Sequence, residues 1–340
     1  MNKLVLMSKS KVDELVNTRS GETKFGEQIM VLPSITNIYD DLKHLDVKYV
    51  LIGLPEDVGV FANNGKQGTC KAWDATIKIL LNTQNNSLNQ GEQLCILGHL
   101  DFYEAQKQLS KWDQNNERHL KKVRALVSEI DKEVSNLVFN IVKAGKIPII
   151  IGGGHNNAYG NIKGTSLALK NKINVVNFDA HTDFRALEGR HSGNGFSYAF
   201  AEGFLNRYFI FGIHENYTSQ NILNEALNGE NTIKYNTFEA IEVRKEFKFK
   251  SEIKKALKYV SKANFGIEID CDAIANIPSS AQTPSGFSVN QAREFVHSFG
   301  SHKLAAYLHI CEAAPTKKTE AQVGKLIAYL ITDFMRANSN

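Results

Sequence analysis

The stretch that most constrains this chain is residues 174–185, which reads NVVNFDAHTDFR. Its first half has the apolar, β-branched composition of a strand that is covered on both faces. Asp179, His181 and Asp183 then follow at every second position, so their side chains point to one side of an extended chain. Two carboxylates and an imidazole suit a divalent cation, although Asp and His at a strand end also serve as turn formers. The stretch therefore predicts a buried strand that ends in a metal site, provided that other segments supply further ligands.

Segments typical of strands and of helices alternate along the rest of the chain. Apolar runs predict strands at residues 47–54, 94–97, 147–151, 174–178, 207–213, 265–269 and 303–311. Apolar residues at intervals of three and four predict helices at residues 70–81, 117–144, 158–170, 251–262, 289–299 and 320–336. This alternation predicts an α/β fold with three layers, α/β/α, and a mostly parallel central sheet. We expect residues 1–340 to form a single domain, with residues 1–46 as a peripheral N-terminal segment.

Composition excludes several classes of protein. With 340 residues, 42% of them apolar and 22% charged, the chain has the composition of a soluble globular protein. The formal net charge of +4 is mild and gives no reason to expect a nucleic-acid partner. The one basic cluster, residues 244–262, is interrupted by glutamates, so we interpret it as a solvated helix face.

The apolar runs and the cysteines of the sequence predict its compartment. The first residues, MNKLVLMSKSK, contain too few consecutive apolar residues for the core of a signal peptide, and no later run approaches the length of a membrane span. The four cysteines show no CxxC pairing, which favours reduced thiols. We therefore expect a cytoplasmic protein without a membrane partner.

Two further predicted strands end in candidate metal ligands. His155 follows IPIIIGGG, and Asp270 and Asp272 lie at the end of FGIEIDCD, where alternation places both carboxylates on one face. The carboxyl ends of parallel strands lie at one edge of a sheet, so these side chains can meet those of residues 179–183. The predicted ligands are His155, Asp179, His181, Asp183, Asp270 and Asp272.

This ligand set carries more negative charge than one divalent ion needs. Crowded carboxylates without a cation raise one another's pKa and resist ionisation. Two cations that share bridging carboxylates would remove this repulsion. Oxygen and imidazole ligands without a thiolate favour manganese, with iron, cobalt or nickel as alternatives. We therefore expect two Mn²⁺ per subunit, which would acidify a water between them.

The order of the motifs resembles that of the ureohydrolase family, which includes arginase, agmatinase and formimidoylglutamase. The shared motifs are GGGH at residues 152–155, DAHTDFR at 179–185, IDCD at 269–272 and CEAAP at 311–315. The loop GLPEDVGVFANNGKQGT makes the formimidoylglutamase branch the most similar one. This resemblance implies a hydrolase that cleaves a C–N bond of a linear amidine. The implied substrate is N-formimino-L-glutamate, which would give L-glutamate and formamide in histidine degradation.

The resemblance also implies roles for individual residues. One manganese would be held by His155, Asp179, Asp183 and Asp270, and the other by Asp179, His181, Asp270 and Asp272. Asp183 would orient the attacking water, and Glu312 would pair with the cationic amidino group. Arg185 would either clamp a carboxylate of the substrate or form an ion pair with a ligand carboxylate. The family commonly forms oligomers, so a homo-oligomer is implied.

The loop that follows DAHTD departs from arginase and agmatinase, whose His-Gly pair shuttles a proton. Here the loop reads RHSGNGFSYAF, so Ser192 stands at the place of that histidine and His191 precedes it. We expect His191 to be catalytic, and Ser192, Asn194 and Arg185 to contact the substrate. A guanidino substrate and a non-catalytic, ligand-binding relative remain alternatives. A deacetylase with a single zinc is disfavoured because the predicted ligands are too many.

Overall fold

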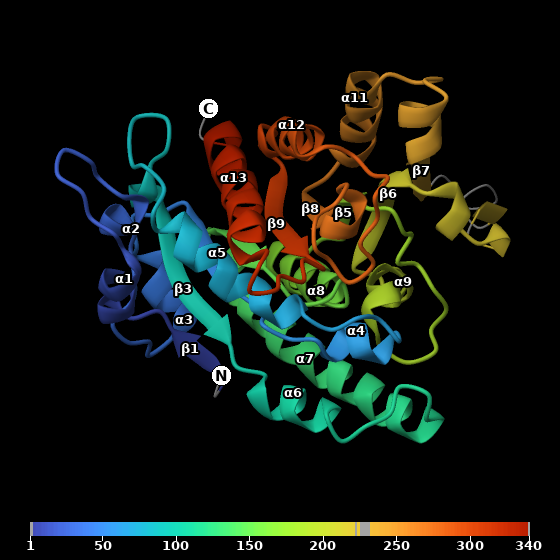
Figure 1. The fold of residues 1–340 in the computed structure, drawn as a ribbon, viewed down its shortest axis with the longest axis horizontal. Coiled ribbons are helices and arrows are strands. Elements are labelled where there is room, and N and C mark those ends of the chain that lie inside the picture. Colours follow the sequence, from blue (N-terminus) through green and yellow to red (C-terminus); the bar gives the residue numbers. More distant parts are fainter. Residues whose placement is uncertain (1–2, 222, 225–231, 339–340) are drawn as a thin grey trace.

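The computed structural model describes residues 3–221, 223–224 and 232–338. Within these residues, nine strands form one sheet between two layers of helices (Figure 1). The strands are β1 Leu4–Leu6, β2 Tyr49–Gly53, β3 Leu94–Leu100, β4 Ile147–Ile151, β5 Ile173–Phe178, β6 Leu205–Ile213, β7 Ile233–Thr237, β8 Phe265–Asp270 and β9 Ala305–Cys311. Their order is β1-β3-β2-β4-β9-β8-β5-β6-β7, and β1 alone among them runs antiparallel to its neighbour. The predicted three-layer α/β/α fold is confirmed.

Helices bury both faces of this sheet. The helices are α1 Lys9–Leu15, α2 Phe25–Gln28, α3 Ile38–Lys43, α4 Val58–Ala62, α5 Ala72–Leu80, α6 Tyr103–Leu109, α7 Glu117–Lys143, α8 Asn157–Leu169, α9 Gly195–Ala201, α11 Phe249–Val260, α12 Val289–Gly300 and α13 Glu320–Asn338. Helices α5, α11, α12 and α13 pack over one face, and α7, α8 and α9 pack over the other (Figure 1). No helix of the described residues is both long and apolar enough to cross a lipid bilayer.

The predicted elements agree with the observed ones to within a few residues, but two strands and several short helices, among them α4, α6 and α9, were not predicted. The predicted helix at 117–144 is α7, which begins after the N-cap Asn116 and ends one residue before Ala144. The basic cluster contains α11, which buries Ile253 and Ala256 and exposes its lysines, as expected of a solvated face. The strands β1 and β7 were not predicted; β1 adds residues of the N-terminal segment to the edge of the sheet.

The central four strands position the predicted metal site. Strands β4, β9, β8 and β5 are consecutive neighbours and run parallel. The register pairs Phe178 with Ile269 and Asp270 with Cys311, so these strands end at a common level. The segments predicted to carry ligands therefore leave the sheet side by side, at one edge.

Candidate metal centre and active site

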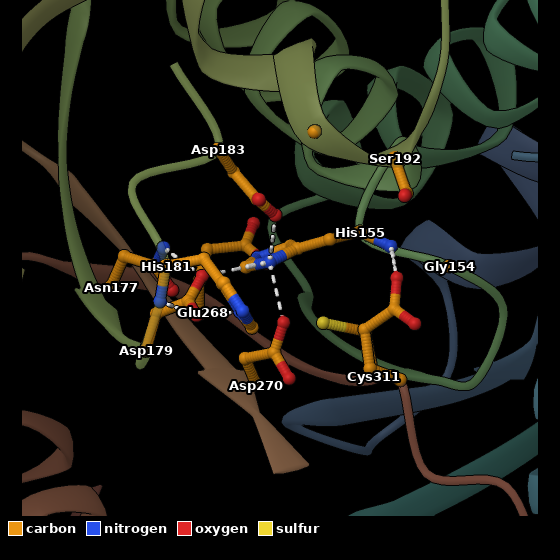
Figure 2. A network of polar contacts seen from close by, with 12 residues as sticks. Gly154, His155, Asn177, Asp179, His181, Asp183, Ser192, Glu268, Asp270 and Cys311 are labelled. Carbon is orange, nitrogen blue, oxygen red and sulfur yellow. Dashed lines mark hydrogen bonds and ion pairs between the residues drawn. The ribbon is translucent and has the colours of Figure 1, made fainter. Parts of the chain in front are cut away.

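The imidazole of His155 lies at the centre of a cluster of carboxylates (Figure 2). Its Nδ1 is 2.8 Å from Oδ2 of Asp183, 3.1 Å from Oδ2 of Asp270 and 3.3 Å from Oδ2 of Asp179. One ligand atom from each of the four residues lies within 4.8 Å of the others. These residues come from the ends of three different strands, and they are the first of the two predicted ligand sets.

A second group of ligands lies beside the first. Nδ1 of His181 is 3.6 Å from Oδ1 of Asp179 and 3.8 Å from Oδ2 of Asp272. Asp179 therefore directs one oxygen towards His155 and the other towards His181. Asp270 lies next to Asp272, whose backbone N–H donates to Oδ1 of Asp270 at 2.7 Å. The structure thus brings all six predicted ligands together, with Asp179 placed between the two groups as a bridging carboxylate must be.

The chemistry of these six side chains fits divalent cations. Burial, together with Asp272 and Asp179, raises the pKa of Asp270 well above its usual value. Burial and the neighbouring charge of Asp179 likewise raise the pKa of Asp183. Such repulsion is the cost of crowding carboxylates without a cation, and bound cations would remove it. Oxygen and imidazole ligands without thiolate suit Mn²⁺.

Local backbone geometry aims several of these groups. Asp183 and Glu312 have φ angles of 43° and 59°, in the left-handed region that non-glycine residues rarely adopt. In the GGGH loop, Gly153 has a φ of 70°, and a Cβ atom there would lie 2.7 Å from Oε1 of Glu56. That same Glu56 oxygen accepts hydrogen bonds from Gly154 N–H and from the side chain of Asn157. The glycine lets the loop pass close to Glu56, which holds the loop in place.

A cleft of about 470 Å³ opens onto the ligands and is also lined by Glu312, Arg185, Ser192 and Tyr217. Oε1 of Glu312 accepts a hydrogen bond from His155 N–H at 2.6 Å. Its other oxygen, Oε2, is buried and has no hydrogen-bond partner among the described residues. Burial and the charge of Asp272 raise the pKa of Glu312 to about 8. The free oxygen is therefore suited to receive a cationic group that enters the cleft.

Two polar residues of the predicted substrate contacts line the same cleft. Arg185 donates to Oδ1 of Asn63 at 2.7 Å and to Oε1 of Glu188 at 3.2 Å, and its side chain is 55% exposed. Among the described residues, it forms no ion pair with a ligand carboxylate, which leaves it available at the cleft. Ser192 accepts a hydrogen bond from the side chain of Asn63 at 3.1 Å.

The structure does not bring His191 and Asn194 into the cleft. His191 is fully buried, its Nδ1 accepts from Gly193 N–H, and its Nε2 lies 3.1 Å from Oε1 of Glu188. Oδ1 of Asn194 accepts from the backbone N–H of His191, and its Nδ2 donates to two backbone carbonyls. The tight turn at Ser192–Asn194 directs both side chains into the loop, so they shape the loop instead of facing the cleft.

Comparison with known proteins agrees with this geometry. The model of the arginase family matches residues 47–336. The chain belongs to the arginase family.

Individual members of the arginase family extend this comparison. A formimidoylglutamase of Streptococcus pyogenes serotype M12 is 27% identical over 293 residues, which cover 83% of this chain and 82% of that protein. The crystal structure of formimidoylglutamase from Bacillus subtilis has a TM-score of 0.74 at 19% identity and covers 95% of this chain and 94% of that one. An Mn²⁺-containing variant of Trypanosoma cruzi formiminoglutamase has a TM-score of 0.71 at 19% identity, covering 94% and 98%. This member of the arginase family is therefore a hydrolase of C–N bonds in linear amidines, most similar to formimidoylglutamase.

Several polar residues around the centre of this arginase-family hydrolase were not predicted. Asn177 donates to Oδ2 of Asp179 at 2.9 Å, and Tyr217 stacks on His181 with ring centroids 5.3 Å apart. Glu268 and His309 are fully buried beside His155. For Asn177, Glu268 and His309, the sequence signal was a charged or polar residue inside a run that otherwise reads as a buried strand, since such residues are rarely buried without a partner.

Proposed function

We propose that the chain is a binuclear manganese hydrolase that converts N-formimino-L-glutamate and water into L-glutamate and formamide, a reaction of histidine degradation. The observation that carries this proposal is the convergence of six ligands, with Asp179 between the two groups. The name of the Streptococcus relative and the Mn²⁺ in the Trypanosoma structure support the choice of substrate and metal.

The six side chains divide into two sets of four. One ion would be held by His155, Asp179, Asp183 and Asp270, and the other by Asp179, His181, Asp270 and Asp272. When bound, the two cations would supply a water acidified enough to act as a nucleophile near neutral pH. Asp183 lines the cleft, so its carboxylate would accept a proton from that water and orient it towards the substrate.

The amidino group would be held by Glu312. Within the described part of the chain, its Oε2 has no hydrogen-bond partner, and a charge-assisted hydrogen bond to a cationic nitrogen would satisfy it. Water would add to the imino carbon, and the bond from that carbon to the glutamate nitrogen would then break. The glutamate nitrogen takes up a proton as it leaves, and the carbon departs as formamide.

The carboxylates of the substrate would be bound at the cleft by Arg185, with Ser192 beside it. Arginine binds carboxylates with two parallel hydrogen bonds, and this side chain is already oriented by Asn63. We assign His191 and Asn194 a supporting role, because their hydrogen bonds fix the turn that presents Ser192. A guanidino substrate remains the alternative, because Glu312 would pair with guanidinium as readily as with an amidinium.

Location and assembly are further parts of the proposal. Cys95, Cys271 and Cys311 are buried and form no disulfide, which is typical of proteins in a reducing compartment. We therefore expect the protein to act in the cytoplasm. The resemblance to oligomeric relatives leads us to expect a homo-oligomer.

A substrate panel tests the proposal. Protein loaded with Mn²⁺ is offered N-formimino-L-glutamate, arginine, agmatine and simple guanidino acids, and release of formamide, urea and amine is measured. We expect formamide from formiminoglutamate alone, and a fall in kcat of about 10²-fold or more in Asp183→Asn, which keeps the size of the side chain. Release of urea from a guanidino compound would show that the substrate is a guanidino compound and not formiminoglutamate. If no compound gives a product, a non-catalytic ligand-binding protein would be favoured.

A further inference from the structure

We propose that Glu268 is a positioning residue for the metal centre: it holds the ring of His155 so that Nδ1 faces the ligand carboxylates, and Tyr307 and His309 hold Glu268 itself in place. This inference rests on the metal centre of the proposed function. It concerns residues that lie behind the ligands, since neither Glu268 nor His309 lines the cleft.

The first step concerns the proton of His155. Its Nδ1 faces three ligand carboxylates, so Nδ1 is the nitrogen that would bind a cation and must carry no proton there. The proton of the neutral ring then lies on Nε2. This Nε2 atom is buried and has no close hydrogen-bond partner among the described residues, and Oε2 of Glu268 faces it at 3.5 Å. A carboxylate behind a ligating histidine fixes both its tautomer and the orientation of its ring.

The second step concerns the rigidity of Glu268. It lies in the central strand β8, and both of its oxygens are bound by side chains of the neighbouring strand β9. Tyr307 donates its hydroxyl to Oε1 at 2.8 Å, and Nδ1 of His309 lies 2.5 Å from Oε2. All three residues are fully buried. The carboxylate therefore has one well-defined position from which to face His155.

The third step concerns the position of His309. Nε2 of His309 lies 3.4 Å from the carbonyl oxygen of Gly152, and its Nδ1 faces Glu268. Both ring nitrogens of His309 thus lie close to oxygen atoms, which holds the ring between Glu268 and the loop. His309 also connects Glu268 to the GGGH loop that carries His155.

The same atoms have an alternative use. His155, Glu268, His309 and Cys311 offer ligand atoms that lie within 4.8 Å of one another, so they are themselves a possible cation site. The short contact between His309 and Glu268 argues against this, because an ion would have to separate them. The positioning role instead uses these contacts as they stand.

Manganese titration of Glu268→Gln tests the inference. Binding of Mn²⁺ is followed by electron paramagnetic resonance, and Tm is measured in EDTA. Glu252→Gln is the matched control, because it makes the same substitution at another buried glutamate, which binds Asn236 and Lys255 on the far side of the sheet. We expect Glu268→Gln to bind one of its two ions roughly 10- to 100-fold more weakly than wild type, and Glu252→Gln to bind both ions like wild type.

The outcomes separate this inference from the proposed function. Wild-type affinity for both ions in Glu268→Gln would overturn the inference, and so would a fall in Tm with unchanged affinity, since that marks a purely structural role. If Glu268→Gln does not fold, His309→Gln replaces it, because it removes the ring that holds the carboxylate of Glu268 in place and should weaken the same ion. Wild-type protein that binds fewer than two ions would instead overturn the metal centre itself.

Discussion

Asp183 and Glu312 stand out among the cleft residues because both have left-handed backbones without being glycine. Such a conformation costs about 1–3 kcal/mol per residue and persists where the surroundings enforce it. Here Glu312 directly follows β9, and Asp183 lies in the loop that follows β5. The two residues with a strained backbone are therefore those that we propose to orient the attacking water and to bind the amidino group.

Glu312→Gln should impair catalysis with little loss of stability. The amide retains the size of the side chain and can still accept from His155 N–H, but it no longer pairs with a cation. We expect kcat/KM to fall by about 10²- to 10³-fold, equivalent to about 3–4 kcal/mol. Steady-state kinetics and Tm check this, with the half-exposed Glu202→Gln as control. An unchanged kcat/KM would show that Glu312 does not bind the amidino group.

At the scale of elements, the packing of α7 against α8 fixes where the GGGH loop ends. Helix α8 begins at Asn157, two residues after His155, so a shift of this helix would move a metal ligand. The helices approach closely at Gly160 and Gly164. A Cβ atom at Gly164 would lie 2.5 Å from the carbonyl oxygen of Ser135 and 2.9 Å from the backbone nitrogen of Phe139.

Gly164→Ala should therefore destabilise the protein. In an exposed helix, alanine gains about 1 kcal/mol over glycine, but here the new methyl group meets backbone that cannot move without separating the helices. We expect a net loss of about 1–3 kcal/mol in the free energy of unfolding, measured by urea denaturation. Leu167→Ala, at an exposed position of the same helix, should change it by less than about 0.5 kcal/mol. Equal or greater stability of Gly164→Ala would contradict the close packing.

The sequence predicted the elements whose pattern is long and regular. The apolar stripe of α7 and the central strands could be predicted because their burial produces a regular pattern of apolar residues in the sequence. β1 and β7 were missed because they are short and lie at the edges of the sheet, where fewer residues need to be apolar. These two strands form because they pair with β3 and β6, and such pairing between distant segments leaves no pattern in the local sequence.

For the whole molecule, the sequence predicted which residues meet, because parallel strands bring their carboxyl ends to one edge. It did not predict how the loops between those ends fold. His191 and Asn194 were expected to contact substrate, but the turn at Ser192–Asn194 points them into the loop. The partners of His155 behind the metal centre were also missed, since Glu268 and His309 become neighbours only through the register of β8 and β9.

The metal-free protein should lose stability as pH rises. The folded protein holds the pKa of Glu312 at about 8, above its ordinary 4.5, through burial and Asp272. The contribution of Glu312 to the free energy of unfolding is therefore fully present below pH 4.5, and it is lost as the pH rises through 8. Burial opposes protonation of His181, but Asp179 and Asp272 raise its pKa to about 10, which acts in the same direction.

The measurement is Tm between about pH 5 and 8, in EDTA and in excess Mn²⁺. We expect Tm in EDTA to fall across this range, and the increase in Tm caused by Mn²⁺ to grow, because metal ions compete with protons for these ligands. A Tm in EDTA that rises steadily to pH 8 would contradict the crowding of carboxylates.

The most direct test of the account is an anomalous difference map from crystals soaked in Mn²⁺. We predict two peaks in each subunit, one among His155, Asp179, Asp183 and Asp270, and the other among Asp179, His181, Asp270 and Asp272. A single peak, or a peak among His155, Glu268, His309 and Cys311, would contradict the account.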